Sequence, residues 1–254
     1  MQASIIIPVY NEAEHLKEFC HQLFSIPVPF SVEYIFVDDG SKDQSVDILH
    51  EVCDLAVCRI HAQNVNQGKG AALHKGIELA QGQVIGIQDA DFEYDPKDLI
   101  NLLQKALNKE ADVIYGSRFK RNTTQVHRTY HYLGNRVLTF FSNLTSGLYL
   151  SDMETCYKVF RADLLKAMVL ECKRFGFEPE VTAKVAQLQL RIREYPISYY
   201  PRNYQDGKKI GWRDGVAALW FIFKFNILQP LLGIKCYDAQ KMPAHLIAKG
   251  RQWL

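Results

Sequence analysis

Residues 84–96 read VIGIQDADFEYDP, a short apolar run that is followed at once by acids. The run VIGI is typical of a strand that is buried on both faces, as in a parallel sheet covered by helices. Asp89, Asp91 and Glu93 follow at alternate positions, so a chain that stays extended beyond the strand presents them on one side. The stretch therefore predicts an α/β protein in which one buried strand ends in a group of carboxylates.

The rest of the first half repeats this alternation of strand and helix. Runs rich in β-branched residues predict strands at residues 3–9, 32–37, 55–61, 83–88 and 112–116. Amphipathic patterns predict helices at residues 12–24, 45–53, 70–80 and 96–107. Helices at 129–144 and 178–190 and a short strand at 191–200 are expected to follow. This order predicts a mostly parallel sheet flanked by helices, which binds ligands at the carboxyl ends of its strands.

Polar residues follow the other expected strands as well. The segment VDDGSKDQS, at residues 37–45, places Asp38 and Asp39 where carboxylates can accept from a base or from ribose hydroxyls. Capping of the next helix explains Ser41 but not the two acids. In NQGKGAAL, Lys69 either contacts a phosphate at a helix N-terminus or is a surface lysine. The chain lacks the GxxxxGK[ST] and GxGxxG spacings, which disfavours a P-loop or dinucleotide site.

The acids after residue 88 are the candidate metal ligands. Asp89, Asp91 and Glu93 are hard oxygen ligands, which suit Mg²⁺ or Mn²⁺ shared with a substrate diphosphate. A solvated acidic turn that caps the following helix is the alternative. Capping accounts for Asp95, which precedes Pro96, better than for the two aspartates directly after the apolar run.

Residues 113–151 contain no acid and gather basic side chains: Arg118, Lys120, Arg121, Arg128 and Arg136. Basic residues among aromatic ones could bind nucleic acid, whereas arginine forks hold a small phosphate. The acids expected at the same edge would repel a polynucleotide, so a small phosphate is expected and nucleic acid is not. A solvated helix face is the alternative for Lys120 and Arg121.

Bulk properties favour a cytoplasmic protein. The 254 residues carry a net charge of +2, which favours no class of partner. The six cysteines have neither metal-site spacing nor the density of a disulfide scaffold. The start of the chain lacks a signal-peptide pattern, and no run reaches the ~20 apolar residues of a spanning helix. One main domain is expected over residues 1–201, with a C-terminal extension over 202–254.

Together the motifs resemble family 2 inverting glycosyltransferases, and within them the polyprenyl- and dolichyl-phosphate sugar transferases. The motifs run in the family order over about residues 3–215: SIIIPVYNE, VDDGSKDQS, NQGKGAAL, QDADFEYDP, GSRF, DMETCYKVF and GFEPEVTAKV. The resemblance implies a GT-A type fold that binds a nucleotide-sugar, with residues 1–201 as the catalytic domain. It implies inverting transfer from a UDP- or GDP-hexose to a polyprenyl phosphate, assisted by Mg²⁺ or Mn²⁺.

The resemblance also implies residue roles. The residues expected to bind the nucleotide-sugar are Pro8, Tyr10, Glu12, Asp38, Asp39, Lys69 and Asp89. Those expected to bind the metal are Asp89, Asp91 and Glu93. Those expected to bind the acceptor phosphate are Ser117, Arg118, Arg128, Asn135 and Lys158. The residues expected at the reaction itself are Asp91, Asp152, Arg118 and Arg128. The family often has Gln where Glu93 stands, so a more acidic metal site is expected here.

Two other activities stay open. Transfer to a glycan or protein hydroxyl in cell-envelope polysaccharide synthesis would need a general base, for which Asp152 is the candidate. A phosphate-, nucleic-acid- or lipid-binding module without chemistry is the third possibility. Many relatives carry C-terminal spanning helices, which are not expected here. Instead, the basic loop after residue 202 and the aromatic residues 220–225 either contact a membrane surface or pack on the core.

Overall fold

The computed structural model describes residues 1–120, 129–201 and 212–243. Within these residues one sheet contains seven strands, in the spatial order β3 (Cys58–Ala62), β2 (Val32–Asp38), β1 (Ala3–Val9), β4 (Val84–Ile87), β6 (Lys158–Arg161), β5 (Val113–Ser117) and β7 (Ile192–Pro196). Only β6 runs antiparallel to its neighbours. The predicted α/β class with a mostly parallel sheet is therefore confirmed.

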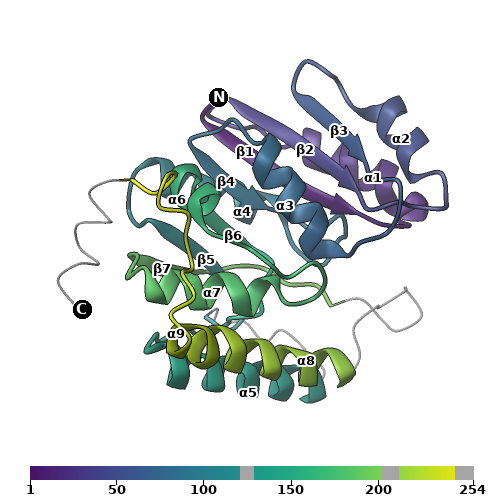
Figure 1. Ribbon diagram of the computed structural model, residues 1–254. Helices are drawn as coiled ribbons and strands as arrows, with labels where there is room; N and C mark the ends of the chain where they lie inside the picture. Colours follow the sequence, from purple (N-terminus) through teal and green to yellow (C-terminus); the bar gives the residue numbers. More distant parts are fainter. Residues whose placement is uncertain (121–128, 202–211, 244–254) are drawn as a thin grey trace.

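Helices flank this sheet (Figure 1). Those of the first half are α1 (Ala13–Phe24), α2 (Ser45–Val52), α3 (Lys69–Leu79) and α4 (Pro96–Leu107). Those that follow are α5 (Thr129–Ser146), α6 (Ala162–Ala167), α7 (Phe177–Gln187), α8 (Trp212–Phe223), the π-helical turn η2 (Lys224–Leu228) and α9 (Gln229–Leu231). α5 and α8 lie side by side below the sheet in this view.

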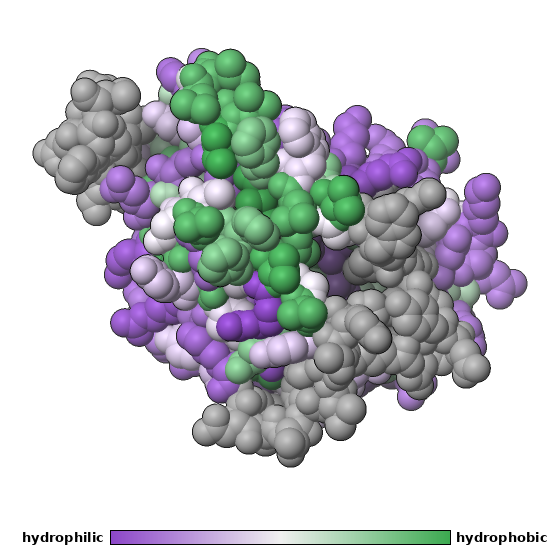
Figure 2. Space-filling view, turned by 90° about the horizontal axis from the view of Figure 1, so that it is seen from below, coloured by the Kyte–Doolittle hydropathy of each residue, from purple (hydrophilic) through white to green (hydrophobic). Residues whose placement is uncertain are grey.

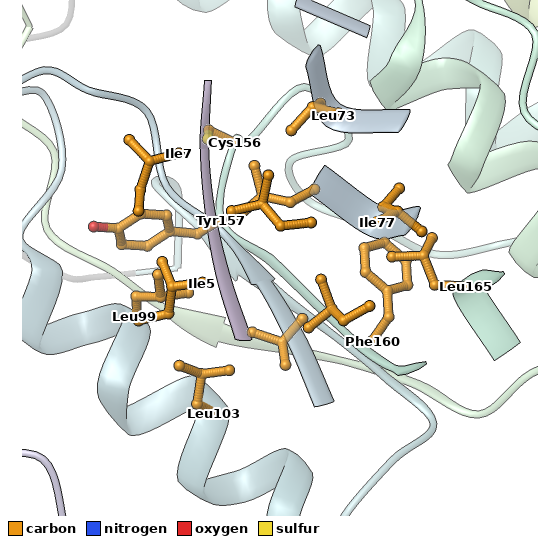
Figure 3. Close-up of a cluster of buried hydrophobic side chains, with 14 of the residues drawn as sticks. Ile5, Ile7, Leu73, Ile77, Leu99, Leu103, Cys156, Tyr157, Phe160 and Leu165 are labelled. Atoms are coloured by element: carbon orange, nitrogen blue, oxygen red, sulfur yellow. The ribbon is translucent and has the colours of Figure 1, made fainter. Parts of the chain in front are cut away.

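The core lies on both faces of the central strands, as Figure 3 shows. Ile5 of β1 lies beside Leu99 of α4, and Ile7 lies beside the ring of Tyr157. Gly86 of β4 lies on the same face, where an added Cβ would stand 3.1 Å from a methyl of Leu103. This close approach favours the glycine in the run VIGI, because a side chain there would press on Leu99 and Leu103.

The strand β6 and the helix α6 were not expected from the sequence. β6 has only four residues and starts at a lysine, so it has no clear apolar signal of its own. The strand expected at 55–61 begins later, at Cys58. Residues 54–57 form a turn instead, in which the carboxylate of Asp54 accepts from Ala56 N and its carbonyl accepts from Val57 N.

The C-terminal segment packs in two ways. Ile222 and Phe225 are buried, whereas Trp220 and Phe223 remain about half exposed, at 53% and 45%. Packing on the core is therefore confirmed for one side of the aromatic helix, and contact of the other side with a membrane stays a prediction. After α9 the chain returns to the sheet domain, where Cys236 O accepts from Val169 N. In the part of the chain that the structure describes, no helix is long and apolar enough to cross a membrane.

Candidate active site

The candidate site lies at the carboxyl ends of β1, β2, β4 and β5. β6 runs the other way, so its first residue, Lys158, lies at the same edge, opposite Tyr115 of β5. Its neighbour Val159 lies opposite Gly86 of β4. The loops that carry the sequence motifs therefore meet along one edge, as the parallel topology predicts.

At the end of β2, the two aspartates have different surroundings. Both oxygens of Asp39 accept from the backbone, one from Gln67 N at 2.8 Å and the other from Gly68 N at 2.7 Å. Asp38 accepts from Ser41 N through Oδ2, while its buried Oδ1 has no partner among the described residues. Asp39 thus fixes the loop before α3, and Asp38 keeps one buried oxygen without a partner among the described residues. The predicted contact of Asp39 with a base stays a prediction.

The residues predicted to line the nucleotide pocket lie at the end of β1. Ile6 is the last residue of β1 that pairs with β4, and Pro8 lies two positions beyond it. Proline has no N–H, but at this position its absence interrupts no hydrogen bond to β4. Tyr10 and Glu12 are half-buried in the turn that leads into α1. Ser45 Oγ, at the start of α2, accepts from Glu12 N at 3.0 Å. The ends of β1 and β2 are therefore tied together.

The loop before α3 packs closely against Cys172 and Lys173. Gly68 has a φ of +106°, and a Cβ on Gly70 would stand 2.0 Å from Cys172 O. Ala71 N donates to Lys173 O at 2.9 Å. Only glycine fits this approach, which explains the sequence GKG at the start of the helix.

Lys69, the first residue of α3, makes the central ion pairs of the site. Its Nζ lies 2.8 Å from Asp89 Oδ1 and 3.3 Å from Glu178 Oε1 in the first turn of α7. Burial acts to lower the pKa of this ammonium, but the carboxylates, Asp89 first, hold it well above its ordinary value. Of the two readings from the sequence, the surface lysine is therefore wrong.

The remaining acids of the motif lie in a turn. Asp91 Oδ1 accepts from Glu93 N at 3.0 Å, and Glu93 Oε2 accepts from the hydroxyl of Tyr199 at 3.1 Å. Asp95 Oδ1 accepts from Lys97 N at 2.9 Å and caps α4, as predicted. The acidic segment thus consists of a strand-end group, residues 89–93, and a separate helix cap.

The donor chemistry of Asp89 and Asp91 fits a magnesium or manganese ion. However, no three His, Cys, Asp or Glu side chains converge closely enough to hold an ion by themselves in residues 1–120, 129–201 and 212–243. Mg²⁺ commonly takes one or two carboxylates and completes its shell with water and substrate phosphates. An ion held by these residues would therefore complete its shell with water and substrate phosphates.

Arg118, directly after β5, is engaged by Asp152. Its Nε and Nη2 donate to the two carboxylate oxygens of Asp152, both at 2.7 Å, and its backbone N donates at 3.0 Å. Asp152 is fully buried and Arg118 is 8% exposed. The guanidinium also lies over the ring of Tyr199, 5.1 Å from its centroid. The structure therefore places two predicted residues in one buried pair.

The other predicted acceptor residues have mixed surroundings. Ser117 Oγ is 2.6 Å from Ser151 Oγ, inside the protein. Lys158 is buried, donates to the carbonyls of Met153 and Thr155, and lies over the Tyr115 ring. Asn135 lies half-buried on α5, and Arg128 lies outside the described residues. Their predicted contact with an acceptor phosphate stays a prediction.

Two acids that the sequence did not single out lie in the site. Glu178 pairs with Lys69. Glu154 has a buried Oε1 without a partner among the described residues. Burial, and then the nearby carboxylate of Glu178, raise the pKa of Glu154 to about 7. Both residues lie inside quoted motifs, but only the fold brings them together, because they are 24 positions apart in the chain.

Comparison with known proteins identifies the family of the chain. Residues 4–169 match the model of glycosyl transferase family 2. The chain belongs to this family. It is 30% identical over 239 residues to the undecaprenyl-phosphate mannosyltransferase of Micrococcus luteus, covering 87% of this chain and 96% of that protein. It is 27% identical over 209 residues to the undecaprenyl-phosphate 4-deoxy-4-formamido-L-arabinose transferase of Edwardsiella ictaluri, covering 81% of this chain.

The chain spans 62% of the length of that arabinose transferase, less than two thirds. Among solved structures, the family 2 chain resembles glucosyl-3-phosphoglycerate synthase from Mycobacterium tuberculosis, with a TM-score of 0.67 and 15% identity over 94% of this chain and 81% of that one. That enzyme was solved with Mn²⁺ and uridine diphosphate. The predicted GT-A type fold, family and polyprenyl-phosphate branch are confirmed.

Proposed function

We propose that this family 2 chain transfers a hexosyl group from a UDP- or GDP-linked donor to a polyprenyl phosphate, with inversion at the anomeric carbon. The observation that carries the proposal is the pairing of two features at one sheet edge. The carboxylates of Asp89 and Asp91 follow β4, and the buried Arg118–Asp152 pair follows β5. The curated relatives, which are named as transferases onto undecaprenyl phosphate, support the acceptor class.

The donor would bind across the ends of β1, β2 and β4. Pro8, Tyr10, Glu12 and the free oxygen of Asp38 would meet the nucleoside, and Lys69 and the start of α3 would meet the diphosphate. Asp89 and Asp91, with Glu93 beside them, would hold Mg²⁺ or Mn²⁺. When bound, such an ion neutralises the charge that develops on the leaving diphosphate.

The acceptor side argues for a phosphate rather than a hydroxyl. A sugar or protein hydroxyl needs a base, and Asp152 was the candidate. Asp152 has no exposed surface, and both its oxygens already accept from Arg118. A phosphate monoester needs no base, because it is mostly ionised at neutral pH. One of its oxygens can attack the anomeric carbon while the bond to the diphosphate breaks on the opposite face.

We also propose that the chain contacts the cytoplasmic face of a membrane through the side of α5 and α8 that faces away from the sheet. Figure 2 shows hydrophobic side chains gathered in a band across this face. Its exposed members are Leu133, Val137, Phe140, Phe141, Leu144, Val216, Leu219, Trp220 and Phe223. A lipid acceptor must be reached at a bilayer surface, and the acid-free tract around α5 suits anionic headgroups. The six buried cysteines, all unpaired, are typical of a reducing compartment.

The test is a transfer assay with radiolabelled UDP- and GDP-hexoses, Mg²⁺ or Mn²⁺, and a short polyprenyl phosphate. We expect a labelled, acid-labile lipid product with at least one donor, and none when the acceptor is the matching polyprenol without phosphate. Transfer to the polyprenol, or to a free sugar, at an equal rate would contradict the proposed acceptor.

A further inference from the structure

Lys69 occupies the position from which a cation would neutralise Asp89. Its Nζ lies 2.8 Å from one oxygen of Asp89 and 3.2 Å from the other. The side chains of Lys69 and Asp89 are only 18% and 23% exposed, so water screens this pair weakly. An ion that bound Asp89 in this arrangement would stand beside a lysine ammonium of the same sign.

We infer that Lys69 is an internal counter-ion that competes with the divalent cation for Asp89, so that the cation binds together with the nucleotide diphosphate and not before it. The inference rests on the proposed function and names the order in which two of its ligands bind. Lys69 is a positioning residue in this account, since it acts through Asp89.

A diphosphate would change both sides of the competition. It offers the ion further oxygen ligands, because the described residues bring no three His, Cys, Asp or Glu side chains together at one point. It also offers Lys69 an anionic partner in place of Asp89. Because Lys69 opens α3, the dipole of this helix favours the same phosphates.

The contact with Glu178 explains how the lysine can change partners without leaving the site. Glu178 Oε1 lies 3.3 Å from Nζ and belongs to α7, so this contact can persist when Asp89 is released. The backbone at the start of α3 is fixed by the close approach of Gly70 to Cys172 and by the bond from Ala71 N to Lys173 O. Only the side chain of Lys69 therefore needs to move.

Mn²⁺ binding tests the competition without any turnover. It is measured as the decrease in the EPR signal of free Mn²⁺. Wild-type protein should bind Mn²⁺ weakly alone and at least about tenfold more tightly with UDP or GDP. Lys69→Met should bind Mn²⁺ alone about tenfold more tightly than wild type and gain less from the nucleotide. Lys69→Arg keeps the charge and should behave like wild type.

Lys75→Met is the matched control, because Lys75 lies on the same helix and pairs with Glu78 at 3.0 Å, outside the site. It should leave Mn²⁺ binding unchanged. Circular dichroism checks that each variant is folded, and the wild-type comparison with and without nucleotide stands even if Lys69→Met does not fold. A wild type that binds Mn²⁺ equally well without nucleotide, or a folded Lys69→Met with no gain, would overturn the inference. If neither UDP nor GDP binds, the proposed function fails, and the metal-alone comparison still decides the competition.

Discussion

Arg118 and Asp152 form a buried pair that joins the end of β5 to the segment before β6, with three hydrogen bonds from the arginine to one carboxylate. The carboxylate keeps the pKa of Arg118 well above its ordinary value, although burial alone would lower it. The pair thus organises the site by fixing one guanidinium edge, and only the other edge can meet a ligand.

Asp152→Ala should therefore destabilise the protein strongly, because it leaves the arginine buried and unpaired. Loss of one partner from such a pair typically costs about 3–5 kcal/mol. Urea unfolding followed by circular dichroism measures the loss. The double variant Arg118→Met, Asp152→Leu should recover part of it. A loss no larger than that of Glu51→Ala, which breaks the exposed pair with Lys17, would contradict the assigned burial.

Asp91→Asn and Asp95→Asn separate the two functions of the acidic segment. Asp91→Asn should lower metal-dependent transfer by about 100-fold or more, since it removes a candidate ligand of the ion that stabilises the leaving group. Asp95→Asn should leave transfer nearly unchanged and cost at most about 1 kcal/mol, because Asn also caps helices. The transfer assay and urea unfolding are run on both. Equal loss of transfer in both variants would show that the segment acts as a unit.

Much of the fold could be predicted from the sequence because its signals are local. The buried run of β4 and the capping Asp95 each have a physical cause within a few residues. The glycines of the loop before α3 mark a loop in the same local way, but their physical cause is the approach to the distant Cys172 and Lys173. β6 could not be found in this way. Its four residues are a strand only because β4 and β5 lie on either side of them.

The partners of the site residues were harder to predict than their positions. The pattern NQGKG indicates a loop, but not that Lys69 reaches Asp89 and Glu178, which lie 20 and 109 positions further along the chain. Likewise, no local pattern shows that Asp152 will be closed off by Arg118. Such pairs depend on which strand ends become neighbours, and this is a property of the sheet order.

The stability of wild type should fall with rising pH because of Glu154. Its pKa is raised to about 7, from an ordinary value of 4.5, mainly by burial. The folded state therefore binds the proton more tightly than the unfolded state. The contribution of Glu154 to the free energy of unfolding is therefore fully present below pH 4.5. It declines as the pH rises from 4.5 to about 7 and is absent above that.

Glu154→Gln removes this dependence. The difference in unfolding free energy between the variant and wild type should favour the variant increasingly between pH 4.5 and 7 and then stay level. Urea unfolding at half-unit pH steps measures it. Glu14→Gln, at an exposed position on α1, should follow the wild-type curve. A constant difference across the whole range would show that Glu154 titrates normally.

The apolar band on α5 predicts a defined loss of membrane binding. Phe140 and Leu144 lie one helical turn apart and are 61% and 68% exposed, so both would enter a lipid surface. Burial of one such side chain contributes roughly 1.5–3 kcal/mol, so Phe140→Ser with Leu144→Ser should lower vesicle affinity by about tenfold or more. Cosedimentation with vesicles containing anionic phospholipid measures this.

Leu55→Ser is the control, since Leu55 is 70% exposed in the turn before β3. Its binding should match wild type. If both variants bind equally, the band on α5 is not the membrane contact. If the wild type is a dimer and the double variant is a monomer, the band is instead a contact between copies of the chain.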